Sequence, residues 1–295
     1  MMPKNIGFNY RKLFSSYLYI MDKYVELIKA KDIGDKSKKV YLSILSRLFK
    51  EGMKFPTKKA EKEKYVKEFL TKFEKPATRL DLLNVIIILR TEMQLPTDKL
   101  KELRSEFRSD RQTKNIDTMN ELGKTLPTLP EFEAKMDEAF SDGDYRKYAV
   151  NYLMKELGVR NMDVDVTIAK TKKEIEDGKN YLIIQPKKII YIRDSYKTHK
   201  KYGKQVHNIT DDKFMKSIKK IGVGKMLDGG LQNALRKLQI NKLKESDIFK
   251  MIIDDAYDKK DTERINELSK TRGSSIPTIK GNYNVNAEKE IIREL

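Results

Sequence analysis

Residues 152–164 read Tyr152-Leu153-Met154-Lys155-Glu156-Leu157-Gly158-Val159-Arg160-Asn161-Met162-Asp163-Val164. Apolar side chains recur at helical spacing up to Leu157, and glycine is the residue that most often ends a helix in the left-handed conformation. The pattern predicts an amphipathic helix that ends at Gly158 and presents Arg160 at the head of the next segment. The alternative is an ordinary helix-end arginine that pairs with Asp163 or Asp165.

Four short segments downstream are rich in β-branched and aromatic residues, which favour strands. They are Val164–Ala169, Tyr181–Gln185, Ile189–Arg193 and Gln205–Ile209. Helices are expected before them, over Glu131–Phe140 and Asp144–Leu157, and again from Asp211 to the C-terminus. We therefore predict a mainly α, mixed α+β domain with a small antiparallel sheet inserted after its first two helices.

The N-terminal part of the chain has a different character. From Asn9 to about Lys124 the apolar residues recur at three- and four-residue spacing, which predicts four or five helices. The apolar run Leu82–Leu89 predicts a buried helix around which the others pack. The link Gly123–Pro130 holds one glycine, two prolines and two threonines, a composition that stops one helix before another starts. We place a helical bundle at residues 1–125 and the second domain at 126–295.

Charge and composition limit the classes of partner. The chain has 62 Lys+Arg against 44 Asp+Glu, a net charge of +18, which favours a polyanion, although high lysine content alone could reflect a general compositional habit. Because cysteine is absent, disulfides and thiolate-bound zinc are excluded. No apolar run approaches the roughly 20 residues that span a bilayer, so we expect no membrane insertion and an intracellular protein.

The segment after the third predicted strand is strongly basic. Ile189–Arg193 runs into a Lys-Thr turn at Lys197 and returns through Gln205–Ile209, which predicts a lysine at the tip of a hairpin. Further lysines in the same turn are Lys200, Lys201 and Lys204. The alternative is a solvated, lysine-rich loop with no chemical role.

A third motif lies near the end of the chain. It reads Ile265-Asn266-Glu267-Leu268-Ser269-Lys270-Thr271-Arg272-Gly273-Ser274-Ser275-Ile276-Pro277-Thr278 and then Gly281-Asn282-Tyr283-Asn284-Val285. A phenol such as that of Tyr283, with an ordinary pKa of about 10, becomes a nucleophile only beside cations and a proton acceptor. The alternative is that Tyr283, one of 15 tyrosines, is a packing or DNA-stacking aromatic.

Taken in order, these three motifs resemble the signatures of tyrosine recombinases, from about Pro130 to Val285. The resemblance implies that Arg160 clamps the scissile phosphate, that Lys197 protonates the leaving 5′ oxygen, and that Tyr283 forms a 3′-phosphotyrosyl link. Because that link stores the energy of the broken bond, the chemistry implied needs no metal, nucleotide or other cofactor.

The second signature of that family is incomplete here. It has a histidine or lysine followed three residues later by an arginine, whereas this chain has Lys244-Glu245-Ser246-Asp247-Ile248-Phe249-Lys250-Met251. One register puts Ser246 at the histidine and Phe249 at the arginine; a shift of one residue puts Lys250 at the arginine. Arg272 occupies the family's other histidine position, and Arg236 is a further substitute. Losing one clamp costs on the order of 10²–10³ in rate, by analogy with an oxyanion donor.

The resemblance also implies partners and a place of action. It implies a clamp on double-stranded DNA, with contacts from Lys200, Lys201, Lys204 and Arg236, and a homo-oligomer on paired sites. In general character the chain is similar to recombinase-like proteins of large DNA viruses, which implies the cytoplasm or nucleus of a host cell, or a virion. The incomplete second signature leaves an alternative function: a catalytically defective DNA-binding, packaging or virion structural component.

Overall fold

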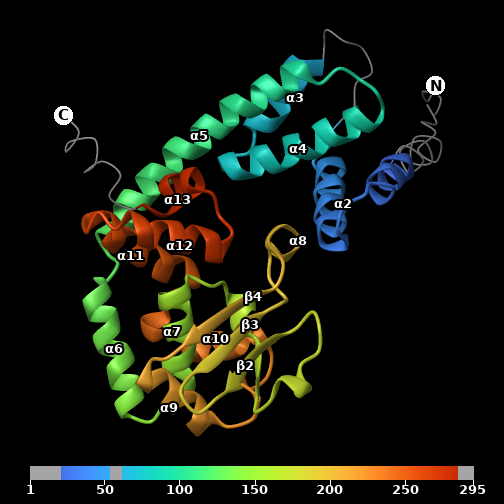
Figure 1. The fold of residues 1–295 in the computed structure, drawn as a ribbon. Coiled ribbons are helices and arrows are strands. Elements are labelled where there is room, and N and C mark those ends of the chain that lie inside the picture. The colour runs from blue at the N-terminus through green and yellow to red at the C-terminus, as the bar shows by residue number, and fades with distance from the viewer. Residues whose placement is uncertain (1–20, 54–61, 285–295) are drawn as a thin grey trace, which may run out of the picture. The chain divides into compact units, whose positions relative to one another are not determined.

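The computed structural model describes residues 21–53 and 62–284 of the chain (Figure 1). The chain forms two compact units, Met1–Lys114 and Asn115–Leu295. The division falls inside helix α5 (Asp98–Gly123), upstream of the link at 123–130 that the composition suggested. The reason is that the first half of α5 packs into the core of unit 1 through Leu100, Leu103 and Phe107.

The regular elements in the described part of unit 1 are helices, joined by short turns. Residues 21–29 are helical, and α2 (Asp35–Lys50), α3 (Lys62–Thr71) and α4 (Pro76–Glu92) follow before α5. The run Leu82–Leu89 lies in α4. Six of its eight residues are buried, and the other two, Asn84 and Ile88, are partly exposed. The expected central helix is therefore confirmed. The predicted helical residues 9–20 and the turn at 54–56 lie outside the described residues.

Unit 2 has a core built mainly by helices around α7 (Tyr145–Leu157), whose Ala149, Val150 and Leu153 are fully buried. The other helices are α6 (Leu129–Ser141), the short α8 (His199–Tyr202), α9 (Asp212–Ile221), α10 (Leu231–Leu238), α11 (Glu245–Asp258), α12 (Thr262–Arg272) and α13 (Ile276–Tyr283). Helix α6 begins inside the Gly123–Pro130 link because Thr128 and Glu131 form a capping box there.

A five-stranded sheet follows α7 in the order β4-β3-β2-β1-β5. Its strands are β1 (Val166–Ala169), β2 (Asn180–Ile184), β3 (Ile189–Arg193), β4 (Gln205–Ile209) and β5 (Gly224–Lys225). The prediction of a mainly α fold with a small inserted sheet is confirmed.

One feature of the sheet differs from the prediction. The pairs β2–β3 and β3–β4 are antiparallel as expected, and the unpredicted β5 is antiparallel to β1, but β1 pairs with β2 in parallel, so the sheet is mixed. Because β1 is only four residues long, the connection at 170–179 can return the chain to its starting end without a full crossover helix. No helix in the described ranges is long and apolar enough to cross a membrane.

Candidate functional site

The end of α7 sets the position of Arg160. Gly158 caps the helix in the left-handed conformation, with φ 59°, and a Cβ there would lie 2.8 Å from Phe249 Cε2 and 2.9 Å from Leu268 Cδ2. Only glycine meets both demands. Arg160 is extended, with φ −89°, and its backbone N–H donates to Asp163 Oδ2 at 2.9 Å. The predicted helix end is confirmed.

The guanidinium of Arg160 points toward the third motif. Its Nη1 donates to the carbonyl oxygen of Arg272 at 2.6 Å, and its Nη2 donates to Ser274 Oγ at 3.4 Å. Asp163 binds the backbone N–H of Arg160, which differs from the ordinary side-chain ion pair considered as the alternative. Burial lowers the pKa of Arg160, and the positive charge of Arg272 lowers it further.

Arg272 is the centre of the cluster and is only 2% exposed. Its Nη1 donates to the Gly158 carbonyl at 2.9 Å, and its Nη2 to Glu245 Oε1 at 2.5 Å and to the Tyr283 hydroxyl at 3.4 Å. The guanidinium carbon lies 4.0 Å from the centre of the Phe249 ring. Arg160, Arg272 and Tyr283, which come from the first and third motifs, therefore meet around the Arg272 guanidinium and carbonyl.

The incomplete second signature has a structural counterpart in Phe249. In the register that puts Phe249 at the missing arginine, the guanidinium of Arg272 lies over that phenyl ring, and Tyr283 packs edge-on against it at 4.8 Å between ring centres. The guanidinium of Arg272, which comes from α12, thus lies beside Phe249. Lys250 lies elsewhere: its Nζ is 3.6 Å from Asp247 Oδ1, and within the described chain it contacts neither Arg160 nor Tyr283.

The β3–β4 hairpin carries the predicted lysines. Lys197 is exposed and makes no hydrogen bond or ion pair with the described chain. Its neighbour Thr198 lies against Gly273, because a Cβ on Gly273 would collide with the Thr198 side chain. The tip of the hairpin therefore reaches Gly273, the residue next to Arg272. The exposed side chain of Lys197 lies one position before this contact in the chain.

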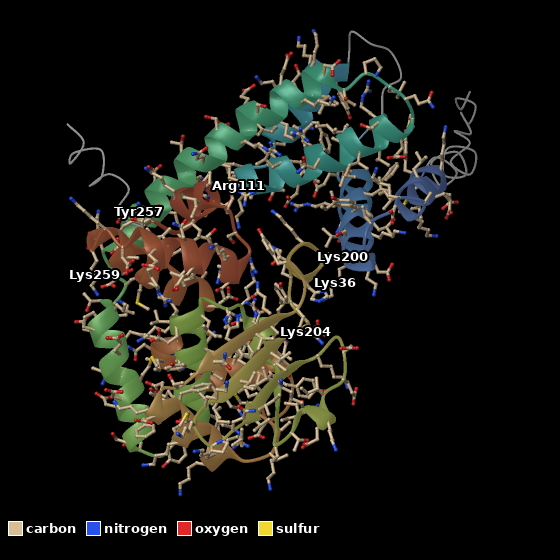
Figure 2. All side chains as sticks on the ribbon, in the orientation of Figure 1. Lys36, Arg111, Lys200, Lys204, Tyr257 and Lys259 are labelled. Atoms are coloured by element: carbon tan, nitrogen blue, oxygen red, sulfur yellow. The ribbon has the colours of Figure 1, made fainter. Side chains whose placement is uncertain are left out.

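The other hairpin lysines have different surroundings. Lys200 is exposed (Figure 2). The ammonium of Lys201 lies 5.0 Å from the centre of the Tyr202 ring. Lys204 pairs with Asp177 at 2.9 Å and with Asp194 at 3.4 Å. Lys200 and Lys201 thus remain available to an external anion, whereas Lys204 is already neutralised.

A buried ion pair that the motifs did not reveal supports the cluster. Asp163 and Arg193 are both 0% exposed, and Arg193 Nη2 donates to Asp163 Oδ2 at 2.7 Å. Arg193 Nη1 also donates to the carbonyl of Thr271 at 2.7 Å. Burial raises the pKa of Asp163, and the charge of Arg193 opposes that rise. The available signal was an arginine ending an otherwise apolar strand.

A second network holds the base of the hairpin. Asn180 Oδ1 accepts the backbone N–H groups of Asp194 and Ser195 at 2.9 and 2.8 Å. Asp194 Oδ2 accepts the Gly178 N–H at 2.8 Å, and Asp194 Oδ1 lies 2.9 Å from His199 Nε2. The Gly178 N–H is the main reason why the pKa of Asp194 is lowered.

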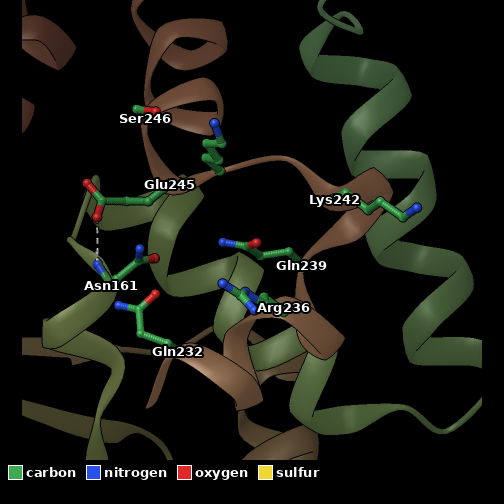
Figure 3. A pocket seen from close by; sticks show the side chains of 8 residues that line it. Asn161, Gln232, Arg236, Gln239, Lys242, Glu245 and Ser246 are labelled. Atoms are coloured by element: carbon green, nitrogen blue, oxygen red, sulfur yellow. Dashed lines mark hydrogen bonds between the residues drawn. The ribbon is translucent and has the colours of Figure 1, made fainter. Parts of the chain in front are cut away.

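An open cleft of about 660 Å³ adjoins the cluster (Figure 3). Its lining residues are Asn161, Gln232, Arg236, Gln239, Lys242, Lys244, Glu245 and Ser246. The predicted DNA-contacting Arg236 lies here, and the Asn161 N–H donates to Glu245 Oε2 at 2.7 Å. In the part of the chain that the structure describes, no three His, Cys, Asp or Glu side chains gather in a way that could hold a metal ion.

No family model matches the chain, and no curated protein matches it in sequence. Among solved structures the chain is similar to the crystal structure of XerA recombinase, with 11% identity over 94% of this chain and 98% of that chain, and a TM-score of 0.37. A likeness of this size establishes neither a shared family nor residue roles.

Proposed function

We propose that unit 2 binds double-stranded DNA and that Tyr283 breaks and rejoins a strand through a 3′-phosphotyrosyl intermediate. The observation that carries the proposal is the meeting of two arginines and a tyrosine from distant segments. Arg160 and Arg272 are 112 positions apart, yet the first binds the main chain of the second. Arg272 in turn reaches the Tyr283 hydroxyl at 3.4 Å.

The chemistry follows from these groups. The phenol oxygen of Tyr283 bonds to phosphorus while the bond from phosphorus to the 5′ oxygen breaks, and solvent takes the phenol proton. Arg160 and Arg272 stabilise the charge that develops on the non-bridging oxygens, a role suited to planar guanidinium donors. Lys197 donates a proton to the leaving 5′ oxygen. The phosphotyrosyl bond preserves the energy needed for rejoining.

Electrostatics support a phosphate ligand. The cluster contains the guanidinium groups of Arg160, Arg193 and Arg272 against the carboxylates of Asp163 and Glu245. A net positive charge in a partly buried site attracts an anion more strongly than the same charge in water. Lys200 and Lys201 add two exposed positive charges on the hairpin whose Thr198 lies against Gly273.

The test is a covalent trap on a nicked suicide substrate, resolved on a denaturing gel. We expect the wild type to form a protein–DNA adduct and Tyr283→Phe to form none while it still binds DNA. Tyr257→Phe, which removes a hydroxyl from α11, is the matched control and should keep the adduct. A wild type that binds DNA well but forms no adduct would overturn the enzymatic part of the proposal.

A second candidate is a DNA-binding protein without strand chemistry, such as a packaging, chromosome-organising or virion component. The observation that favours it is the state of Arg272, which is 2% exposed and already paired with Glu245. Either function places the protein where DNA is present, in the cytoplasm or nucleus of a host cell or in a virion. Both also permit a homo-oligomer on DNA.

A further inference from the structure

The carboxylate of Glu245 lies where a phosphate group is expected under the proposed function. Its Oε1 accepts from Arg272 Nη2 at 2.5 Å, and its Oε2 accepts the Asn161 N–H at 2.7 Å. Both donors belong to residues linked to Arg160. Asn161 follows Arg160 in the chain, and the carbonyl of Arg272 accepts a hydrogen bond from the Arg160 guanidinium. One carboxylate therefore spans a guanidinium and a backbone N–H, as two oxygens of a phosphodiester would.

The donors around this carboxylate are not all used. Arg272 is 2% exposed, and its Nε is buried with no hydrogen-bond partner among the described residues. The Nε–H and Nη2–H groups share one edge of the guanidinium, the edge that binds oxyanions in a bidentate way. Glu245 satisfies only Nη2, so the edge suits an anion that offers both donors an oxygen.

The cleft gives the displaced carboxylate a place to go. Glu245 is the first residue of α11 and lines the cleft together with Arg236, Lys242 and Lys244 (Figure 3). Its side chain is 15% exposed. The cleft therefore offers a displaced Glu245 carboxylate a lining that includes three cationic side chains.

We propose that Arg272, Arg160 and the Asn161 N–H form an oxyanion site that the carboxylate of Glu245 occupies in the absence of DNA, and that a DNA phosphate must displace it. The inference rests on the proposed function, since it describes how the same site is regulated. The phosphate would then bind Arg272 Nη2 in place of Glu245, and this is the nitrogen that also donates to the Tyr283 hydroxyl. Phosphate entry and activation of Tyr283 are thereby coupled.

The experiment measures binding of the full chain to a fluorescent DNA duplex by anisotropy over a range of salt concentrations. We expect Glu245→Gln to bind about tenfold more tightly than wild type with a salt slope close to that of wild type, because the same phosphates are neutralised but no carboxylate has to be displaced. Asp255→Asn is the matched control: it removes one negative charge from the same helix, where Asp255 pairs with Lys259, and tests the effect of net charge alone.

Two further measurements keep the inference testable. Glu245→Asp retains the charge on a shorter side chain that cannot span both donors, and it should also bind more tightly than wild type. Inorganic phosphate should raise the melting temperature of Glu245→Gln more than that of wild type. If both Glu245 variants bind no more tightly than Asp255→Asn and phosphate protects none of them, the inference is wrong. A wild type that fails to bind DNA overturns the proposed function instead, while the phosphate measurement still reports on the oxyanion site.

Discussion

Asp163 shows how much of the site depends on one side chain. Its Oδ2 receives the Arg160 N–H and the Arg193 guanidinium, and Arg193 in turn holds the carbonyl of Thr271. A single buried carboxylate therefore ties the segment that presents Arg160 to the segment that presents Arg272. Buried charges of this kind persist only when they are paired and hydrogen-bonded, which both partners are here.

His207 is the residue whose titration should be visible in the stability of the protein. Burial, together with the charge of Arg193, lowers the pKa of His207 to about 4, from an ordinary value of 6.5. As pH falls below 6.5 the unfolded chain binds a proton that the folded chain does not, so stability decreases until about pH 4 and then levels off. The contribution lost is on the order of 3 kcal/mol.

The measurement is the melting temperature of wild type and of His207→Gln between pH 7 and pH 4. We expect the wild type to lose more stability than the variant over this range, since the carboxylates that titrate near pH 4 are common to both. Parallel curves for the two proteins would show that His207 is accessible to protons in the folded state.

At the level of elements, the junction between α7 and the Arg160 segment is the most constrained. Gly158 needs the left-handed conformation, and a Cβ on it would collide with Phe249 of α11 and Leu268 of α12. The cap that ends α7 is thus the contact surface for two other helices. A change at this turn alters the packing of α11, which carries Glu245 and Phe249, together with the direction of Arg160.

Gly158→Ala separates backbone strain from packing. We expect it to destabilise the fold by about 2–4 kcal/mol, because the left-handed strain adds to the collision with Phe249 and Leu268. Gly143→Ala is the control: its φ is 79°, but a Cβ there meets nothing within 4 Å, so only the strain of about 1 kcal/mol remains. Urea unfolding of the two variants measures the difference. Equal losses would mean that α11 and α12 move aside freely.

At the level of the whole molecule, the net charge of +18 is a property of the entire chain, so it does not by itself locate a ligand. The pairing of β2, β3 and β4 separates two lysine pairs, which lie at opposite ends of the sheet. The β3–β4 hairpin tip, with Lys200 and Lys201, projects from one end of the sheet, whereas the β2–β3 turn, with Lys187 and Lys188, lies at the other end. If unit 2 binds DNA at the cluster, only the first pair is near it.

The prediction compares two double variants of equal charge. Lys200→Ala with Lys201→Ala should weaken DNA binding and lower the salt slope by about 1.8, because two phosphate contacts are lost. Lys187→Ala with Lys188→Ala should change the slope little. Anisotropy titrations at several salt concentrations provide the measurement. A larger effect from the second pair would place DNA at the opposite end of the sheet.

The local pattern of the chain was sufficient for most of the elements. Helical spacing, the Gly158 cap and the β-branched segments act within a few residues, so α6, α7, β3 and β4 could be predicted closely. The parallel pairing of β1 and β2 could not be predicted, because strand pairing depends on the path of the connecting segment. The short β5 strand could not be predicted either, because the glycines at 222 and 224 suggest only a turn.

For the candidate site the same distinction holds. The sequence alone determined that Arg160 follows a helix cap, that Lys197 lies in a hairpin turn and that Tyr283 lies near the end of the chain. Only the tertiary structure decided that Arg272 stacks on Phe249, that Glu245 occupies its guanidinium, and that Asp163 pairs with Arg193. These contacts join residues 23–30 positions apart in the chain, where no helical or strand periodicity relates one side chain to another and only the packing of separate elements brings the charges together.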